Sequence, residues 1–370
     1  MKILVAMDEF NGIISSYQAN RYVEEAIASQ IDHADIVQVP LFNGRHELLN
    51  SVFLWHSGTK YKVNVHDADM NEIETIYGQT EEGTVIIESN LFSKGHKAIE
   101  QRTSFGLGEV ILDALNKDTD HIIISLGGMD SFDGGVGMLQ ALGAKFYDDE
   151  NRELDAREGA QMIKFIRHID ISGLPSTLEN VRLQVMTGFS SKLYGKNSEI
   201  MKLSYNHQIP HKKAVEIDNL IWYLNEIMKN ELHIALGPIE RGGIAAVLKA
   251  LYNTEILTSH ELVNQITHLD ELVSQADLII FGEGLKEEDH MLETTTLTIA
   301  ELTEKYHKPS IAICATNDKF DIFNHHRVTA MFNTFIEMPK TYTDFKMGLQ
   351  IRHYTVQALR LLKTTAKGIK

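Results

Sequence analysis

The sequence has little cysteine, little positive charge and no long apolar run, and each of these absences excludes a class of protein. The only cysteine, Cys314, rules out a disulfide within the chain and fits a reducing compartment. No stretch approaches the ~18 consecutive apolar residues of a membrane span. The segment Met1–Asp8 holds too short an apolar run for a secretion signal. We therefore expect a cytoplasmic protein with no membrane partner.

Positive charge is scarce relative to negative charge. The 35 Lys and Arg residues face 51 Asp and Glu residues, so the formal net charge is −16. A nucleic acid is an unsuitable partner, because no basic field is available to neutralise its phosphates. The charge by itself is explained by solubility. An anionic small molecule would need local cations or backbone N–H groups to hold it.

The chain is long enough for about two domains, with 370 residues. An apolar strand at Lys2–Met7, a helical pattern at Ser16–Ser29 and a second strand at Asp35–Val39 predict a parallel sheet. The same alternation returns late in the chain, with strands at Ala276–Phe281 and Pro309–Ala315.

The middle of the chain has a different pattern. Strand-like runs at Tyr61–Val65, Glu72–Gly78 and Thr84–Glu88 have little helix between them, which predicts an antiparallel meander in another sheet. The fold class we predict is α/β with two domains. Residues 1–55 plus 255–370 would form a discontinuous Rossmann-like domain, and residues 56–254 an inserted mixed α/β domain. The hinge between two such domains is where small ligands tend to bind.

A glycine cluster after the apolar run His121–Leu126 is the strongest local signal. Gly127, Gly128, Gly134 and Gly135 allow positive φ angles and a close approach of a ligand to the backbone. A helix starting near Gly134 would direct free N–H groups at a phosphate or carboxylate. A tight turn without any ligand is the alternative. Neither a Walker A sequence nor a complete dinucleotide fingerprint is present.

Charged and polar residues also stand at other predicted strand ends. Asp8 follows the first strand, and Glu283 lies within a Gly-Glu-Gly segment after the strand Ala276–Phe281. Ligands of open α/β sheets bind at such ends, although an N-cap or a solvated turn explains each acid equally well. Arg45 follows the second strand and would suit an acidic ligand. Gly237–Gly243 is a second glycine-rich segment that opens a helix.

Taken in order, these segments resemble the type I bacterial glycerate kinases from Met1 to about Leu362. That family's motifs D-S-F-K-G-S, V-P-x-A-D-G-G-E-G-T, T-x-G-T-G-E-L-I, G-G-S-A-T-N-D-G-G, P-G-A-G-A-A-G-G and G-E-G are similar to the segments that begin at Asp8, Val39, Thr103, Gly127, Leu236 and Gly282. The resemblance implies a Rossmann-like domain with an inserted α/β domain. It also implies transfer of the γ-phosphoryl group of ATP to D-glycerate, with Mg²⁺, usually giving 2-phosphoglycerate.

The resemblance also implies roles for individual residues. The catalytic set is Asp133, Asp8 and Glu283, with Asp133 as the preferred general base. The substrate-binding set is Asn11, Asn43, Arg45 and Arg241. The phosphate-binding set is Gly127, Gly128, Asp130, Ser131, Gly134 and Gly135. Glu283 and Glu287 are the metal ligands.

Several polar positions of the family's motifs are occupied differently in this chain. Asn11 stands at the lysine of the first motif, and Met129 and Phe132 stand at a serine and an asparagine of the glycine-rich motif. A small-acid kinase that binds a nucleotide remains our main prediction. A non-catalytic protein that binds a small anion in the same cleft is the alternative, and a kinase with another acceptor is a third. A homodimer is left open.

Overall fold

The computed structural model describes residues 1–10, 12–44, 46–187, 191–236, 243–284, 294–315, 320–334 and 343–368. The chain forms two compact units. The first unit contains Met1–Asn43, Asn50–Trp55 and Ser259–Lys370, and the second contains Gly44–Leu49 and His56–Thr258. Each unit is built around a sheet of its own.

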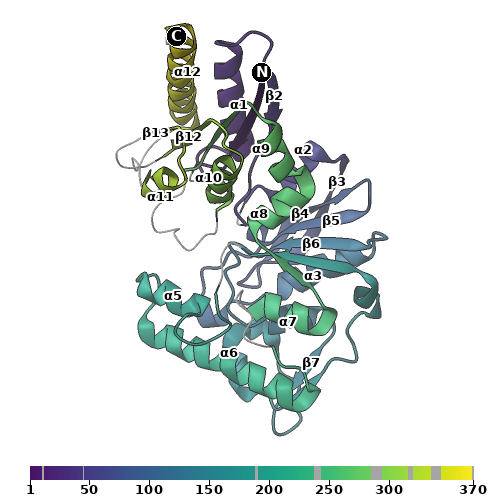
Figure 1. Cartoon of the computed structure of the whole chain (residues 1–370). Helices are drawn as coiled ribbons and strands as arrows, with labels where there is room; N and C mark the ends of the chain where they lie inside the picture. The colour runs from purple at the N-terminus through teal and green to yellow at the C-terminus, as the bar shows by residue number, and fades with distance from the viewer. Residues whose placement is uncertain are drawn as a thin grey trace. The chain divides into compact units, whose positions relative to one another are not determined.

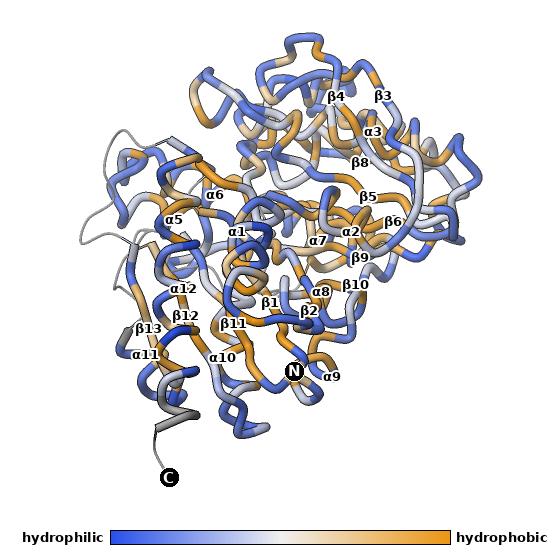
Figure 2. Tube along the Cα trace, turned by 90° about the horizontal axis from the view of Figure 1, so that it is seen from above, coloured by the Kyte–Doolittle hydropathy of each residue, from blue (hydrophilic) through white to orange (hydrophobic). Residues whose placement is uncertain are grey.

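The first unit has a parallel five-stranded sheet in the order β13-β12-β11-β1-β2. Figure 1 labels β2, β12 and β13 of this sheet. Its strands are β1 (Lys2–Met7), β2 (Asp35–Gln38), β11 (Leu278–Gly282), β12 (Ser310–Cys314) and β13 (Ala330–Asn333). Strands β11 and β12 are buried throughout and β1 is buried in all but its first residue, which explains their continuous apolar sequences. These strands form the apolar centre of the unit (Figure 2).

Helices cover this sheet. They are α1 (Ser16–Ala28), α8 (Ser259–Thr267), α9 (Leu269–Gln275), α10 (Thr295–Lys305), α11 (Phe320–His325) and α12 (Asp344–Gly368). Helix α2 (Leu48–Trp55) begins in the second unit and continues in the first from Asn50. Helix α1 begins at a capping box in which Ser15 and Gln18 satisfy each other's backbone N–H groups. Its residues Val23 and Ile27 share one core with Ile351 of α12, and the two helices lie side by side (Figure 1).

The second unit has a six-stranded sheet in the order β10-β9-β6-β5-β4-β3. Its strands are β3 (Gly58–His66), β4 (Glu72–Thr80), β5 (Thr84–Glu88), β6 (His121–Ser125), β9 (Arg182–Met186) and β10 (Glu255–Leu257). The first three strands pair antiparallel, whereas β5, β6, β9 and β10 pair parallel. A separate antiparallel pair contains β7 (Lys145–Tyr147) and β8 (His168–Asp170).

Helices of the second unit pack around this mixed sheet. They are α3 (Phe105–Leu115), α4 (Val136–Ala141), α5 (Glu199–Tyr205), α6 (His211–Leu232) and α7 (Gly243–Tyr252). Short 3₁₀ helices are η1 (Ser89–Leu91), η2 (Ile99–Gln101), η3 (Ala156–Phe165) and η4 (Ser176–Asn180). One large apolar cluster joins the strands to α3, α4, α6 and α7.

The structure confirms the predicted α/β class, with one parallel and one mixed sheet. It also adds helices that the sequence pattern did not predict. The stretch Ser190–Lys213 has poor apolar periodicity in the sequence, yet it contains α5 and the start of α6. Helix α5 is too short for its apolar period to be recognised. No helix in the described ranges is both long and apolar enough to span a bilayer.

Candidate active site

Acidic side chains follow two neighbouring strands of the first unit. Asp8 comes directly after β1, Glu283 directly after β11, and the Asp8 N–H donates to the carbonyl of Gly282 at 2.8 Å. The sheet order places β2 on one side of β1 and β11 on the other. The carboxyl ends of β1 and β11 are therefore a topological switch point, where ligands of open α/β sheets bind.

These acids are buried and connected to further polar groups. Asp8 is 0% exposed and Glu283 is 2% exposed. A carboxylate oxygen of Glu283 accepts a hydrogen bond from the Thr296 hydroxyl at 2.6 Å, and Asp8 accepts one from the Glu9 N–H at 2.7 Å. The side-chain amide of Asn43 donates to the buried Glu9 carboxylate at 3.2 Å. The edge thus concentrates three carboxylates and an amide in the first unit.

The donors at this edge fit Mg²⁺. This ion prefers oxygen ligands and is commonly bound by one or two carboxylates together with substrate phosphates. Asp8 and Glu283 provide two such carboxylates. Among the residues described, no three or more His, Cys, Asp or Glu side chains are arranged to hold a metal on their own. The edge therefore suits an ion shared with a phosphate ligand more than a closed structural site.

The predicted glycine-rich turn lies in the second unit, directly after β6. Gly128, Gly134 and Gly135 have φ angles of 82°, 65° and 87°. Residues with a Cβ rarely adopt this left-handed region, so the backbone path of the turn requires glycine whether or not a ligand is bound. Gly135 is the N-cap of α4, which has only six residues.

Asp133 is fully buried beneath this turn and is saturated with hydrogen bonds. Its carboxylate accepts from the N–H groups of Ser104, Gly135 and Gly137 at 2.7, 3.0 and 3.1 Å. It also accepts from the hydroxyls of Ser104 and Thr103 at 2.9 and 3.3 Å. Burial raises the pKa of Asp133, while the hydrogen bonds from Ser104 and Gly135 act against that rise. The first amides of α4 are thus engaged by Asp133.

Asp130, in the same turn, is also held by neighbouring segments. Its carboxylate lies 3.1 Å from the Arg102 guanidinium and accepts from the Gly95 N–H at 3.2 Å. The carbonyl of Gly128 accepts from the Ser93 hydroxyl at 3.4 Å. Both aspartates of the turn therefore have partners within the protein.

The two glycine-rich segments recognised in the sequence meet in space. A Cβ added to Gly243 would lie 2.8 Å from the Cα of Gly134. Gly243 is the first residue of α7. The close approach of the backbones explains glycine at 243, whereas Gly134 requires glycine for its φ of 65° and because an added Cβ would lie 2.6 Å from the Leu224 side chain.

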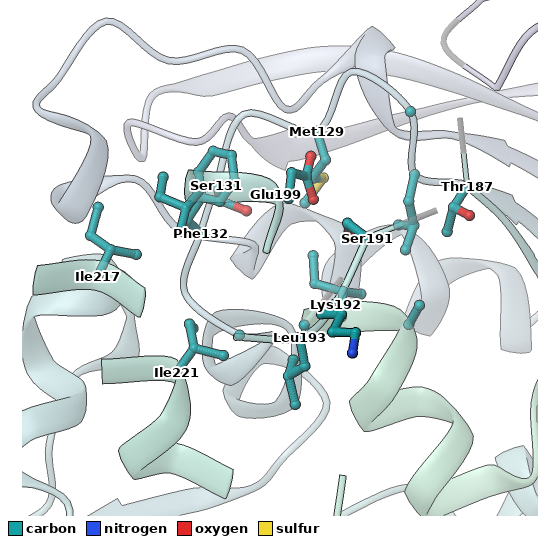
Figure 3. Close-up of a pocket in the computed structure, with 17 residues that line it drawn as sticks. Met129, Ser131, Phe132, Thr187, Ser191, Lys192, Leu193, Glu199, Ile217 and Ile221 are labelled. Atoms are coloured by element: carbon teal, nitrogen blue, oxygen red, sulfur yellow. The ribbon is translucent and has the colours of Figure 1, made fainter. Parts of the chain in front are cut away.

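A pocket of about 70 Å³ opens beside this contact, within the second unit (Figure 3). This volume has room for several water molecules or for part of a small ligand. Its apolar lining consists of Leu126, Met129, Phe132, Leu193, Ile200, Ile217, Ile221 and Ile244, with Ala245. Its polar lining consists of Ser131, Thr187, Ser191, Lys192 and Glu199, and Gly127, Gly134 and Gly243 contribute backbone. Leu126 and Thr187 enter it from the carboxyl ends of the paired strands β6 and β9.

Comparison with known proteins gives the family of this chain. The model of the glycerate kinase family matches residues 3–359. The chain belongs to the glycerate kinase family. It is 27% identical over 345 residues to glycerate 2-kinase of Escherichia coli K12, and 25% identical over 343 residues to glycerate kinase of Halalkalibacterium halodurans. Each of these two matches covers 90% of both chains.

The solved structures agree on the fold. A crystal structure of a Salmonella typhimurium LT2 protein assigned as glycerate kinase 2 superposes with a TM-score of 0.86. The match covers 99% of each chain at 23% sequence identity. The family match over residues 3–359 confirms the resemblance to glycerate kinases that the motifs predicted.

Four residues predicted for the glycerate kinase site lie outside the described part of the chain. They are Asn11, Arg45, Arg241 and Glu287. Of the others, the structure brings Asp8, Asn43 and Glu283 into the first unit, and it places the glycine-rich turn in the second. Ser131 lines the pocket directly.

Sequence reasoning did not assign five polar residues that the structure places in or beside these sites. They are Glu9, Thr187, Ser191, Lys192 and Glu199. Thr187 follows a predicted strand. Ligands of open α/β sheets bind at the carboxyl ends of strands, so the reasoning that selected Asp8 could also have selected Thr187. The last three belong to the stretch with poor periodicity, which gave no local signal. Met129 and Phe132, which replace polar residues of the glycerate kinase motif, both line the pocket.

Proposed function

We propose that this protein is an ATP-dependent glycerate kinase that phosphorylates D-glycerate to 2-phosphoglycerate. The observation that carries the proposal is the family match over residues 3–359. The relatives named glycerate 2-kinase and glycerate kinase support it. The buried carboxylates at the switch point of the first unit support it, because phosphoryl transfer depends on positioning and on neutralising phosphate charge.

Asp8 and Glu283 are the residues that we assign to Mg²⁺ and to the acceptor hydroxyl. The ion, when bound, neutralises charge on the phosphates. Asn43 and Glu9 lie at the same edge and would orient the hydroxyls of glycerate. We propose that substrate binding brings this edge and the glycine-rich turn of the second unit to one reaction centre.

The role of Asp133 in this proposal is to position the turn. A general base must be within hydrogen-bond reach of the proton that it removes. The Asp133 carboxylate already accepts five hydrogen bonds from its own unit. We therefore propose that Asp8 removes the hydroxyl proton of glycerate. Asp133 instead holds the glycine-rich turn in its folded conformation.

The test is a kinase assay on the purified chain with ATP, Mg²⁺ and D-glycerate. Wild type is expected to form phosphoglycerate and ADP, and Asp8→Asn and Glu283→Gln are each expected to lower kcat by about 10²-fold, as for other groups that act on developing charge. Glu25→Gln, an exposed acid on α1, is the matched control and should retain full activity.

Absence of product from folded wild-type protein would overturn the kinase proposal. If ATP or D-glycerate then still raised the melting temperature, the chain would be a binding protein, because a ligand that binds only the folded state stabilises it. Turnover of another hydroxy acid with no effect of glycerate would identify a kinase with a different acceptor. Full activity in Asp8→Asn would contradict the assignment of Asp8.

A further inference from the structure

The pocket of the second unit contains buried hydroxyls that have no hydrogen-bond partner among the described residues. Ser131 is 8% exposed and Ser191 is 4% exposed. Among the described residues, neither hydroxyl has a hydrogen-bond partner, and the same holds for Thr187. Buried polar groups are nearly always paired in folded proteins, since an unpaired one is unfavourable. Three such hydroxyls lining one pocket indicate a ligand that supplies the partners.

Apart from Lys192 and Glu199, the remaining side chains that line the pocket are apolar. Ile217 and Ile221 project from consecutive turns of α6 (Figure 3). Ile200 belongs to α5 and Ile244 to α7. Burial of apolar surface is favourable in proportion to its area. The ligand portion that enters the pocket is therefore largely apolar on its faces and carries hydrogen-bonding groups at its edge.

The charges of the lining indicate that the part of the ligand that enters the pocket is uncharged. Lys192 and Glu199 contribute one charge of each sign, so the lining formed by the described residues has no net charge. A carboxylate or phosphate placed among the isoleucines would lose its hydration without compensation. Glycerate has a carboxylate, two hydroxyls and no apolar part, so it does not suit the pocket. A planar heterocycle with donors and acceptors along one edge does.

We propose that this pocket binds the purine base of a nucleoside triphosphate, with the hydroxyls of Ser131, Ser191 and Thr187 at the edge of the ring. The inference rests on the proposed use of ATP. Gly127 and Gly134 line the same pocket, so a nucleotide held there passes beside the glycine-rich turn. The resemblance in sequence predicted that Ser131 of this turn binds phosphate. In the present proposal the Ser131 hydroxyl contacts the base instead.

The test is calorimetric titration of the full chain, in the presence of Mg²⁺, with two probes. One is a non-hydrolysable ATP analogue, and the other is inorganic triphosphate, which lacks the base. Ser131→Leu fills the pocket and is expected to weaken analogue binding by about tenfold or more, and Ser191→Ala by about fivefold, the usual value of one hydrogen bond. Neither variant should change the affinity for triphosphate.

Thr75→Val is the matched control. Thr75 is 5% exposed, and its hydroxyl also lacks a partner among the described residues, but it lies on β4 and does not line the pocket. This variant should bind the analogue as wild type does. Thermal unfolding of each variant checks that it is folded.

Unchanged analogue affinity in both pocket variants would overturn the proposal. An equal loss for the analogue and triphosphate would also overturn it, because the pocket would then hold phosphate. A rise in KM for D-glycerate with no change for the analogue would assign the pocket to the acceptor. If pocket variants weaken only the analogue while wild type forms no phosphoglycerate, the base assignment stands and the glycerate kinase proposal fails.

Discussion

Asp133 shows how one side chain can organise the starts of two helices. Its two oxygens accept hydrogen bonds from the N–H groups of Gly135 and Gly137, at the start of α4, and from Ser104, at the start of α3. An ionised carboxylate has two acceptor oxygens and no donor, whereas the amide and hydroxyl side chains also carry donors. The two helices are therefore joined through a single buried acid.

Replacement of this acid should destabilise the fold. Asp133→Asn would direct an amide NH₂ at N–H and hydroxyl donors, so we expect a loss of about 2–3 kcal/mol in the free energy of unfolding. Urea denaturation of purified protein measures it.

Asp130→Asn is the control within the same turn. The Asp130 side chain is 42% exposed in its ion pair with Arg102, and the expected loss is below about 1 kcal/mol. Equal losses in the two variants would contradict the organising role of Asp133.

At the scale of elements, His121 connects three neighbouring strands of the second unit. Its Nε2 lies 2.9 Å from the side-chain oxygen of Gln184 on β9, and its Nδ1 lies 3.2 Å from the hydroxyl of Thr84 on β5. The Gln184 amide nitrogen donates to Glu255 on β10, so its oxygen faces the histidine. The neutral ring that donates through Nε2 and accepts through Nδ1 satisfies both contacts.

Acid should weaken this connection. Burial lowers the pKa of His121 below its ordinary value near 6.5, and the charge of Arg182 acts in the same direction. The unfolded chain therefore binds a proton more readily than the folded chain, so stability present above about pH 6.5 is lost as the pH falls. We expect the free energy of unfolding to decrease between pH 7.5 and 5.5, with a smaller decrease in His121→Gln. An identical pH slope in the variant would contradict this account.

The approach of α4 and α7 depends on a glycine for reasons of space alone. Gly243 lacks a positive φ, but a Cβ there would meet the backbone of Gly134 at 2.8 Å. Gly243→Ala should therefore lower the free energy of unfolding by about 1–3 kcal/mol, as overpacking does, although alanine favours helices. Denaturant unfolding measures the change.

Gly195→Ala separates steric crowding from backbone strain. Gly195 has a φ of 89° and no atom within 4 Å of an added Cβ, so only the left-handed backbone opposes the substitution, by about 1 kcal/mol. A Gly243→Ala protein as stable as wild type would show that the two segments separate easily.

At the scale of the whole molecule, each unit has its own sheet and its own apolar core. The chain enters the second unit after Asn43, returns to the first for Asn50–Trp55, re-enters the second at His56 and returns to the first at Ser259. The proposed roles divide in the same way. The acids Asp8 and Glu283 belong to the first unit, and the glycine-rich turn and the pocket belong to the second.

The strands that position the site were predictable, because they are buried on both faces and read as continuous apolar runs. The strand-end rule then identified Asp8, Glu283 and the glycine-rich turn. The partners of Asp133 were not predictable, since Ser104 precedes it by 29 positions and no local pattern joins them. Ile217 and Ile221 resemble the apolar face of any amphipathic helix, so nothing in the sequence distinguished them as pocket walls.

The sequence by itself determined the α/β class, the family and the requirement for glycine at the turn, because these depend on local periodicity, motif order and backbone conformation. Only the tertiary structure decided what the turn offers a ligand. Folding buried Asp133 against the first amides of α4 and placed Ser131 among isoleucines from α6. Which groups remain available for binding depends on contacts between residues distant in the chain, and local sequence does not encode such contacts.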